Sequence, residues 1–273
     1  MHGSHASGVP VLDVAVLALA ALGVVVYVTS AVASRANGRP WPRHRSVLWC
    51  AGVAAGAASV VGPLAAAAHD DFVAHMAAHL LGGMVAPLLL VLAAPVTLAL
   101  RALAATPARR VSRMLRSTPA RIVSHPVTAG IVSAGGLWVI YLTPVLDAVR
   151  ADPLAHLLVH AHLLAAGYLF TAAIIGLDPR LHPSPRALAV TVLVATMAAH
   201  SILAKYLYAH PPVGYEQASV EAGAQLMYYG GAWIEGTVVV VFCAQWYRAA
   251  GRRSARAATT VDRGRPLRPH WSA

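Results

Sequence analysis

Residues 73–100 read VAHMAAHLLGGMVAPLLLVLAAPVTLAL, a run without a single aspartate, glutamate, lysine or arginine. A helix needs about 20 apolar residues to cross the hydrocarbon core of a bilayer, so this run predicts a transmembrane helix. Its length leaves room for a tilt, or for a kink at Pro87 or Pro95. The run therefore indicates an integral membrane protein.

Further apolar segments lie on both sides of this run, separated by breaks rich in Pro, Gly and Asp. They cover residues 11–33, 47–67, 126–145, 154–176, 187–208 and 221–247. The chain is 58% hydrophobic and only 11% charged, which is too little charge to cover the surface of a soluble domain. The sequence thus predicts an all-α, polytopic membrane helix bundle of about seven transmembrane helices over 11–247. A tail at 1–10 precedes the bundle and a basic tail at 248–273 follows it.

The distribution of charge predicts the orientation of the bundle. Every arginine except Arg150 falls in residues 34–46, 101–125, 177–186 or 248–273. Acidic residues lie at the other ends of the segments: Asp13, Asp70, Asp71, Asp147, Asp152, Glu216 and Glu221. Because cytoplasmic loops are rich in Lys and Arg, we expect the N-terminus outside and the C-terminus in the cytoplasm.

The net charge of +11 comes from the same arginine-rich segments. Basic cytoplasmic loops suit anionic lipid headgroups, so membrane lipid is the expected partner and nucleic acid is not. The Arg, Pro and Thr content of the basic tail favours disorder or contact with headgroups.

The histidines are concentrated toward the outer side. Of the 14 histidines, only His44, His125, His182 and His270 map to the inner side. From the rise of about 1.5 Å per residue, His79, His160 and His200 lie at similar depths, about one to two turns below the outer ends of three helices. His75 lies four residues before His79, and His156 four before His160, so each pair shares one helix face.

This pattern predicts a metal site that is open to the outer face. Polar side chains within a membrane normally face the bundle interior, and imidazole binds copper, zinc or iron. Met76 and Met197 share helix faces with His79 and His200, and thioethers favour Cu(I). We therefore expect copper, as Cu(I), with these ligands: His75, His79, His156, His160 and His200. Taken singly, the histidines also suit the headgroup level and the methionines suit packing.

Four further polar residues lie within or near the apolar segments. His162 lies about 100° or more around its helix from both His156 and His160, so it faces a neighbouring helix or supports a ligand. Glu221 and Gln225 share a face and would support histidines by hydrogen bonds. Glu235, near the middle of the last segment, is either a proton or ion relay or a protonated carboxyl bonded to a neighbouring helix. No P-loop, zincin or Ser-His-Asp pattern occurs, so the sequence makes no case for an enzyme.

Several motifs resemble the CtaG family of cytochrome c oxidase assembly factors. The most specific is His75-Met76-Ala77-Ala78-His79-Leu80-Leu81, continued by Met84-Val85-Ala86-Pro87, Ala94-Pro95-Val96-Thr97 and Arg101-Ala102-Leu103. Further matches are His125-Pro126, Trp138 with Pro144, His156 with His160, Asp178-Pro179, His200, and Gln225 followed by Tyr228-Tyr229-Gly230-Gly231. The resemblance covers about residues 69–245.

The resemblance implies a multi-pass protein of the bacterial plasma membrane, a metallochaperone that helps deliver copper to a haem-copper oxidase. Oxidase subunits and an outer-face copper chaperone would be its partners, and the alanine- and arginine-rich composition resembles that of an actinobacterial source. The chain departs from the family where Ala224 replaces an expected acid and where Glu235 is displaced, which leaves the share of the last helix open. The alternatives are a haem-binding membrane cytochrome, a metal or proton transporter with Glu235 as relay, and a structural scaffold.

Overall fold

The computed structural model describes residues 11–178 and 184–263, with side chains described as far as residue 252. Within these ranges every regular element is a helix. In chain order they are α1 (Val11–Ala36), α2 (Arg43–Ala58), α3 (Pro63–Ala67), α4 (Phe72–Leu80), the π-helical turn η1 (Leu81–Val85), α5 (Ala86–Leu92), α6 (Pro95–Ala102), α7 (Ala105–Leu115), α8 (Thr118–Val123), α9 (Pro126–Gly130), the π-helical turn η2 (Ile131–Gly135), α10 (Gly136–Leu142), α11 (Val145–Ala151), α12 (Pro153–Ile175), α13 (Arg186–Ala209) and α14 (Gln217–Arg263).

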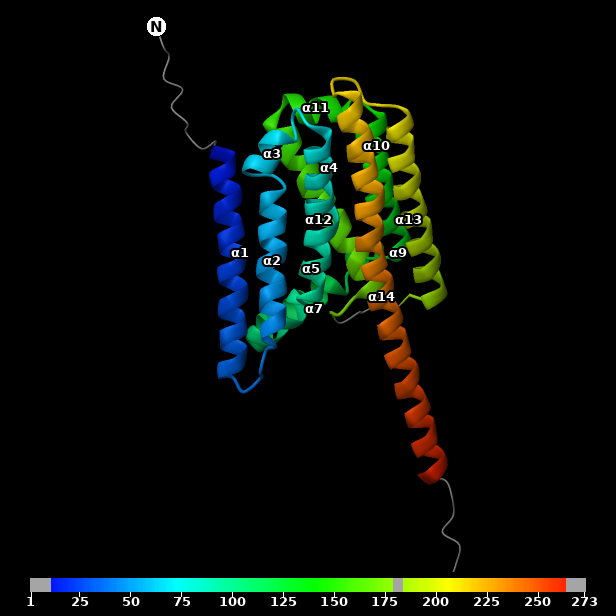
Figure 1. Cartoon of the computed structure of the whole chain (residues 1–273). Coiled ribbons are helices and arrows are strands. Elements are labelled where there is room, and N and C mark those ends of the chain that lie inside the picture. The colour runs from blue at the N-terminus through cyan, green and yellow to red at the C-terminus, as the bar shows by residue number, and fades with distance from the viewer. Residues whose placement is uncertain (1–10, 179–183, 264–273) are drawn as a thin grey trace, which may run out of the picture.

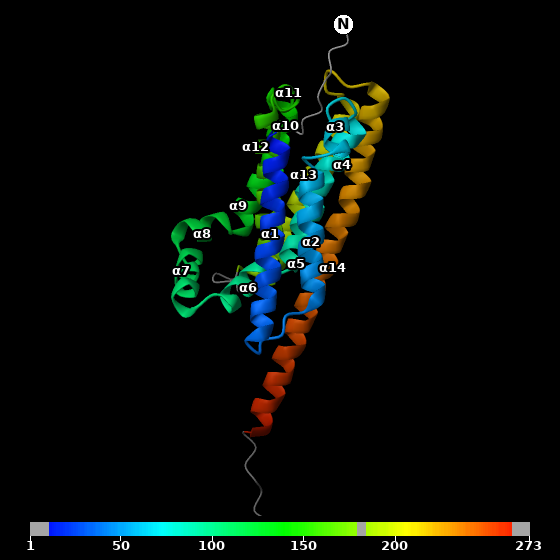
Figure 2. The same ribbon diagram turned by 90° about the vertical axis from the view of Figure 1, so that its left-hand side faces the viewer.

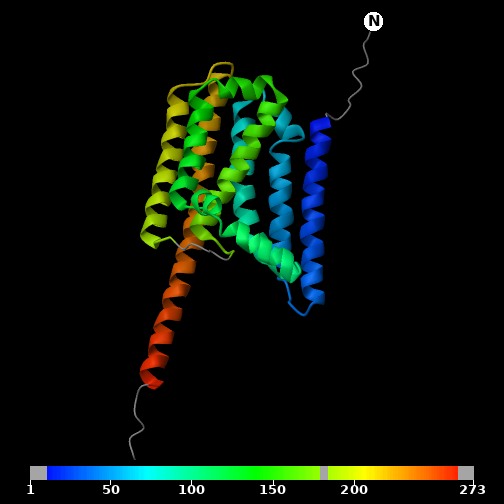
Figure 3. The same cartoon turned by 180° about the vertical axis from the view of Figure 1, so that it is seen from behind.

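The long helices form a bundle in which they run roughly parallel or antiparallel to one another. In the described chain six are long and apolar enough to cross a membrane, and a seventh crossing results if the pair Pro126–Leu142 and Val145–Ala151, bent by 76°, is one span. The prediction of an all-α polytopic membrane bundle is therefore confirmed. Figures 1 and 3 show α1 and α2 side by side at one edge and α13 at the opposite edge.

The described chain begins at one end of the bundle and finishes beyond the other. Figure 1 shows the start of α1 at the same end as α3 and α11, whereas α14 leaves past the end where α7 lies. This arrangement agrees with an odd number of crossings. The arginine-rich α7, with Arg109, Arg110 and Arg113, lies at the end predicted to be cytoplasmic, and Figure 2 shows α7 and α8 projecting sideways there.

The run at 73–100 does not form one continuous helix, and its break lies beside one of the two prolines at which a kink was expected. It is helical from Phe72 to Leu92 through η1, and then Ala94 takes a left-handed conformation with φ +52°. A residue before proline is disfavoured in the helical region, and Pro95 starts α6 in a new direction. The Asp178 carboxylate fastens this turn by accepting hydrogen bonds from the Thr97 amide at 2.7 Å and the Thr97 hydroxyl at 2.6 Å. The predicted end of the span at residue 100 is therefore wrong.

Three other predicted boundaries differ. The segment 47–67 is broken between α2 and α3, where Gly62 has φ +91°. The segment 126–145 ends as a helix at Leu142, before the bend into α11. α14 continues past residue 247 to Arg263, so the first part of the basic tail is helical, and residues 264–273 lie outside the described residues.

Close contacts between helices fill the interior of the bundle. One cluster joins α4, α10, α13 and α14 through buried side chains that include Phe72, Met76, Tyr141 and Leu207. A side chain on Gly167 of α12 would collide with the carbonyl oxygen of Gly83, so α12 lies directly against η1. Small residues permit such close approach in membrane bundles, and this contact brings the histidines of α12 near those of α4.

Candidate metal site

The structure brings histidines from α4, α12 and α13 into the interior of the bundle. His75, His79, His160 and His200 are buried, at 9%, 4%, 9% and 6% exposure. His156 is only partly buried, closer to the start of α12. The predicted ligands therefore converge from three helices, but they do so as neighbouring pairs.

The deepest pair is His79 and His200. Their ring centroids lie 5.9 Å apart with 34° between the planes. Neither ring nitrogen of either residue has a hydrogen-bond partner within the described chain. An imidazole has a donor and an acceptor to satisfy, and burial without partners costs stability. Since metal–imidazole bonds are about 2 Å long, two rings on one ion would have centroids about 6 Å apart. The centroid distance therefore matches that of two imidazoles on opposite sides of one ion.

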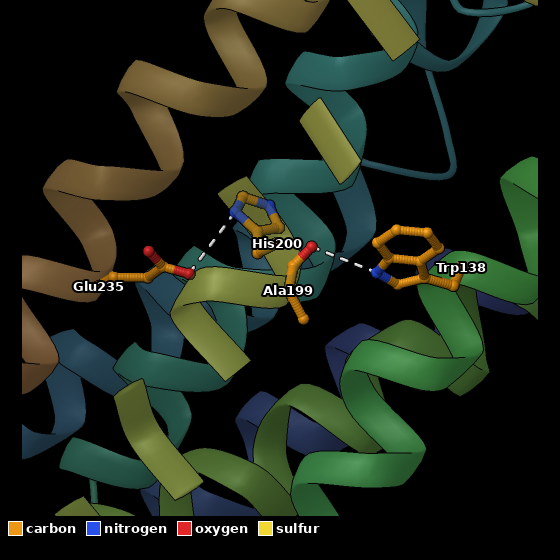
Figure 4. A network of polar contacts seen from close by, with 4 residues as sticks. All are labelled: Trp138, Ala199, His200 and Glu235. Atoms are coloured by element: carbon orange, nitrogen blue, oxygen red, sulfur yellow. Dashed lines mark hydrogen bonds and ion pairs between the residues drawn. The ribbon is translucent and has the colours of Figure 1, made fainter. Parts of the chain in front are cut away.

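Glu235 approaches this pair from α14. Its carboxylate oxygen Oε1 lies 3.5 Å from His200 Nδ1, as Figure 4 shows, which is longer than a normal hydrogen bond. On the other side, the Trp138 indole N–H donates to the Ala199 carbonyl at 3.2 Å and ties α10 to α13. A cavity of about 70 Å³ is lined by His79, His200 and Glu235. It gives these groups space for an ion or a few waters.

A second small cavity, of about 10 Å³, joins His75, His79 and His160. His75 Nε2 and the Tyr141 hydroxyl share a hydrogen bond of 3.0 Å, and that hydroxyl also lies 3.7 Å from the Met76 sulfur. Tyr141 was not among the predicted site residues, because a tyrosine near the end of an apolar segment normally indicates the membrane interface. Met76 is fully buried beside this bond.

A third group lies toward the end of the bundle that holds α3 and α11. The rings of His156 and His160 are 4.3 Å apart, and His69 lies 5.4 Å from His156. His69 belongs to the connection between α3 and α4. It is not among the predicted ligands, and it shares no helix face with another histidine.

The remaining candidates lie away from these groups. His162 is exposed and faces Gly136 of α10, and Met197 packs against an apolar cluster. Glu221 accepts a hydrogen bond from the Gln217 amide at 2.9 Å, and Gln225 is exposed. In the described ranges, no three His, Cys, Asp or Glu side chains are close enough to hold one metal together. The arrangement therefore offers two-ligand sites.

Comparison with known proteins points to one family. Residues 25–249 match the model of the family described as cytochrome c oxidase caa3 assembly factor. An uncharacterized protein of Mycobacterium leprae is 34% identical over 182 residues, which are 64% of this chain and 28% of that protein. Uncharacterized proteins of Mycobacterium bovis and Mycobacterium tuberculosis are each 35% identical over 193 residues, which are 67% of this chain and 29% of theirs. The chain spans less than a third of the length of these curated relatives. No solved structure matches it.

Proposed function

Because the chain belongs to the family of cytochrome c oxidase caa3 assembly factors, we propose that it binds Cu(I) near the outer face of the bacterial plasma membrane and passes it to an oxidase subunit. The observation that carries this proposal is the buried pair of His79 and His200, whose ring nitrogens make no hydrogen bond within the described residues. Copper is the cargo of this function, and no covalent bond of a substrate is broken.

The chemistry of the pair suits a monovalent copper ion. Imidazole is a good copper ligand, and Cu(I) is stable with only two ligands. His79 and His200 would hold the ion, while Glu235 beside His200 would orient that ring and balance the positive charge. The cavity of about 70 Å³ favours an ion over a haem, since sites for organic ligands usually measure about 300–1,000 Å³.

The partners follow from the location of the pair. Copper would arrive from a copper chaperone on the outer face and leave to an oxidase subunit docked at the same end of the bundle. A two-ligand site suits this role, because a recipient with more ligands would withdraw the ion.

The metal content of the detergent-purified protein after Cu(I) loading tests the proposal. We expect about one copper per wild-type chain and almost none in His79→Ala/His200→Ala, because the pair supplies both ligands. His162→Ala is the matched control, since His162 is exposed and faces Gly136. The control should load like the wild type. Wild-type copper in a folded double variant would contradict the site.

A further inference from the structure

A second group of polar side chains lies at the outer end of the histidine groups. A cavity of about 250 Å³ is lined by Asp13 of α1, His69 before α4, and His156 in the first turn of α12. His69 is exposed and its ring lies 5.4 Å from that of His156. Figure 1 shows the start of α1 and α3 at the same end of the bundle. The wall of this cavity thus contains one carboxylate and two imidazoles at the end of the bundle predicted to face outside.

A file of neighbouring histidines leads from this cavity to the buried pair; in order it consists of His69, His156, His160, His75, His79 and His200. His156 is 4.3 Å from His160 between ring centroids. His160 shares a small cavity with His75 and His79, and His79 faces His200. Exposure decreases along the file, from His69, which is exposed, through the half-buried His156, to His160 at 9% and His79 at 4%. The imidazoles therefore form a continuous series from solvent to interior.

The hydrogen bonds of His69 and His160 leave the same ring nitrogen, Nε2, free. His69 Nδ1 bonds the Ala65 carbonyl at 2.9 Å, and His160 Nδ1 bonds the His156 carbonyl at 3.0 Å. A carbonyl accepts, so Nδ1 carries the proton and Nε2 presents a lone pair in both rings. His156 Nε2 is buried without a hydrogen-bond partner within the described chain. These three rings can therefore bind a metal ion through Nε2, whereas His75 Nε2 bonds the Tyr141 hydroxyl, so His75 would bind through Nδ1.

From this geometry we propose that His69 and His156 form a two-ligand uptake site for Cu(I), with the Asp13 carboxylate in the wall of the same cavity as a source of negative charge. The ion then moves along His160 and His75 to the pair of His79 and His200. The inference rests on the proposed function. An ion that exchanges one imidazole at a time is never without ligands in a medium of low dielectric constant. Each step is a ligand exchange without change of oxidation state. Two-ligand steps bind weakly enough to release the ion forward, which agrees with the lack of a three-ligand group in the described ranges.

The rate of copper uptake tests the uptake site separately from the buried pair. Cu(I) is supplied as its coloured complex with bathocuproine disulfonate, and the loss of absorbance is followed after addition of the full-length protein in detergent. His69→Ala and Asp13→Asn should take up copper severalfold more slowly than the wild type and reach the same final copper content. His210→Ala is the matched control, because His210 is another exposed outer histidine and stacks on Tyr206, away from the file.

The outcomes separate the two proposals. A wild-type uptake rate in both His69→Ala and Asp13→Asn, while His79→Ala/His200→Ala stays empty, overturns the uptake site alone. Wild-type copper in His79→Ala/His200→Ala overturns the proposed function. Loss of the final copper content in His69→Ala, in a variant with an unchanged thermal unfolding midpoint, also overturns the uptake site, because it would make His69 a ligand of the stored ion.

Discussion

Gly231 of α14 lies against the imidazole of His200. A Cβ on this glycine would collide with the ring carbon Cε1 of His200. In the sequence, Gly231 contributed only to the resemblance of the Tyr228-Tyr229-Gly230-Gly231 motif. The structure adds a physical reason for glycine there, because only a residue without a side chain leaves room for the ring in its present position.

Gly231→Ala therefore tests the pair without removing a ligand. The added methyl group should displace the His200 ring and lower the affinity for Cu(I) by roughly tenfold. This is the lower end of the range by which loss of a supporting contact weakens metal binding. The measurement is a Cu(I) titration in competition with a chelator. Gly236→Ala on the same helix is the control, because nothing lies within 4 Å of a Cβ at that position. Equal affinities in the two variants would refute the role of Gly231.

At the scale of elements, one acidic residue joins the ends of α4 and α14. Asp71 caps α4 by accepting hydrogen bonds from the amides of Val73 at 3.0 Å and Ala74 at 3.3 Å. The Ser219 hydroxyl of α14 donates to the same carboxylate, and its oxygen accepts from the Phe72 amide at 2.9 Å. The bond from Ser219, with those of the two backbone amides, holds the pKa of Asp71 below its usual value. The carboxylate form thus stabilises the start of the helix that carries His75 and His79.

This lowered pKa predicts how the stability contributed by Asp71 depends on pH. The contribution is complete above the unfolded pKa of about 3.9 and is lost as the pH falls through the lower pKa of the folded state. The difference in thermal unfolding midpoint between wild type and Asp71→Asn should be constant at neutral pH and shrink in acid. Asp147→Asn, which alters an exposed acid, serves as the control. A difference that grows on acidification would contradict the assignment.

At the scale of the whole molecule, the two ends of the bundle differ in chemistry. One end carries His69, His156 and Asp13, and the other carries the arginines of α7 and the extension of α14. Large apolar side chains such as Leu19 and Val25 are exposed on α1, as expected of a surface that faces lipid. The orientation in the membrane itself stays a prediction from the arginine distribution.

Labelling of single cysteines in intact cells tests this orientation. In a background with Cys50 and Cys243 replaced by serine, Glu216→Cys should react with a membrane-impermeant maleimide added outside. Thr106→Cys should react only after the membrane is permeabilised. Both positions are exposed in the structure, so burial does not explain a difference. The reverse pattern would place the N-terminus in the cytoplasm.

Most of the fold was predictable because it depends on hydropathy and on the spacing of residues along the sequence. Hydropathy identified the apolar segments of the bundle, and the spacing of four residues placed His75 with His79 and His156 with His160 on common faces. The turn at Ala94 was less predictable, since its direction depends on Asp178, which lies far along the sequence.

By itself, the sequence determined the membrane class, the approximate spans and the set of histidines from which a site could be built. Only the tertiary structure decided that His79 faces His200, that Glu235 lies beside that pair, that Tyr141 bonds His75, and that His69 joins the outer group. The reason is physical: contacts between helices depend on how each helix is rotated and how closely it is packed. Close approaches such as Gly167 on Gly83 set that rotation, and they leave no periodic signal in the sequence.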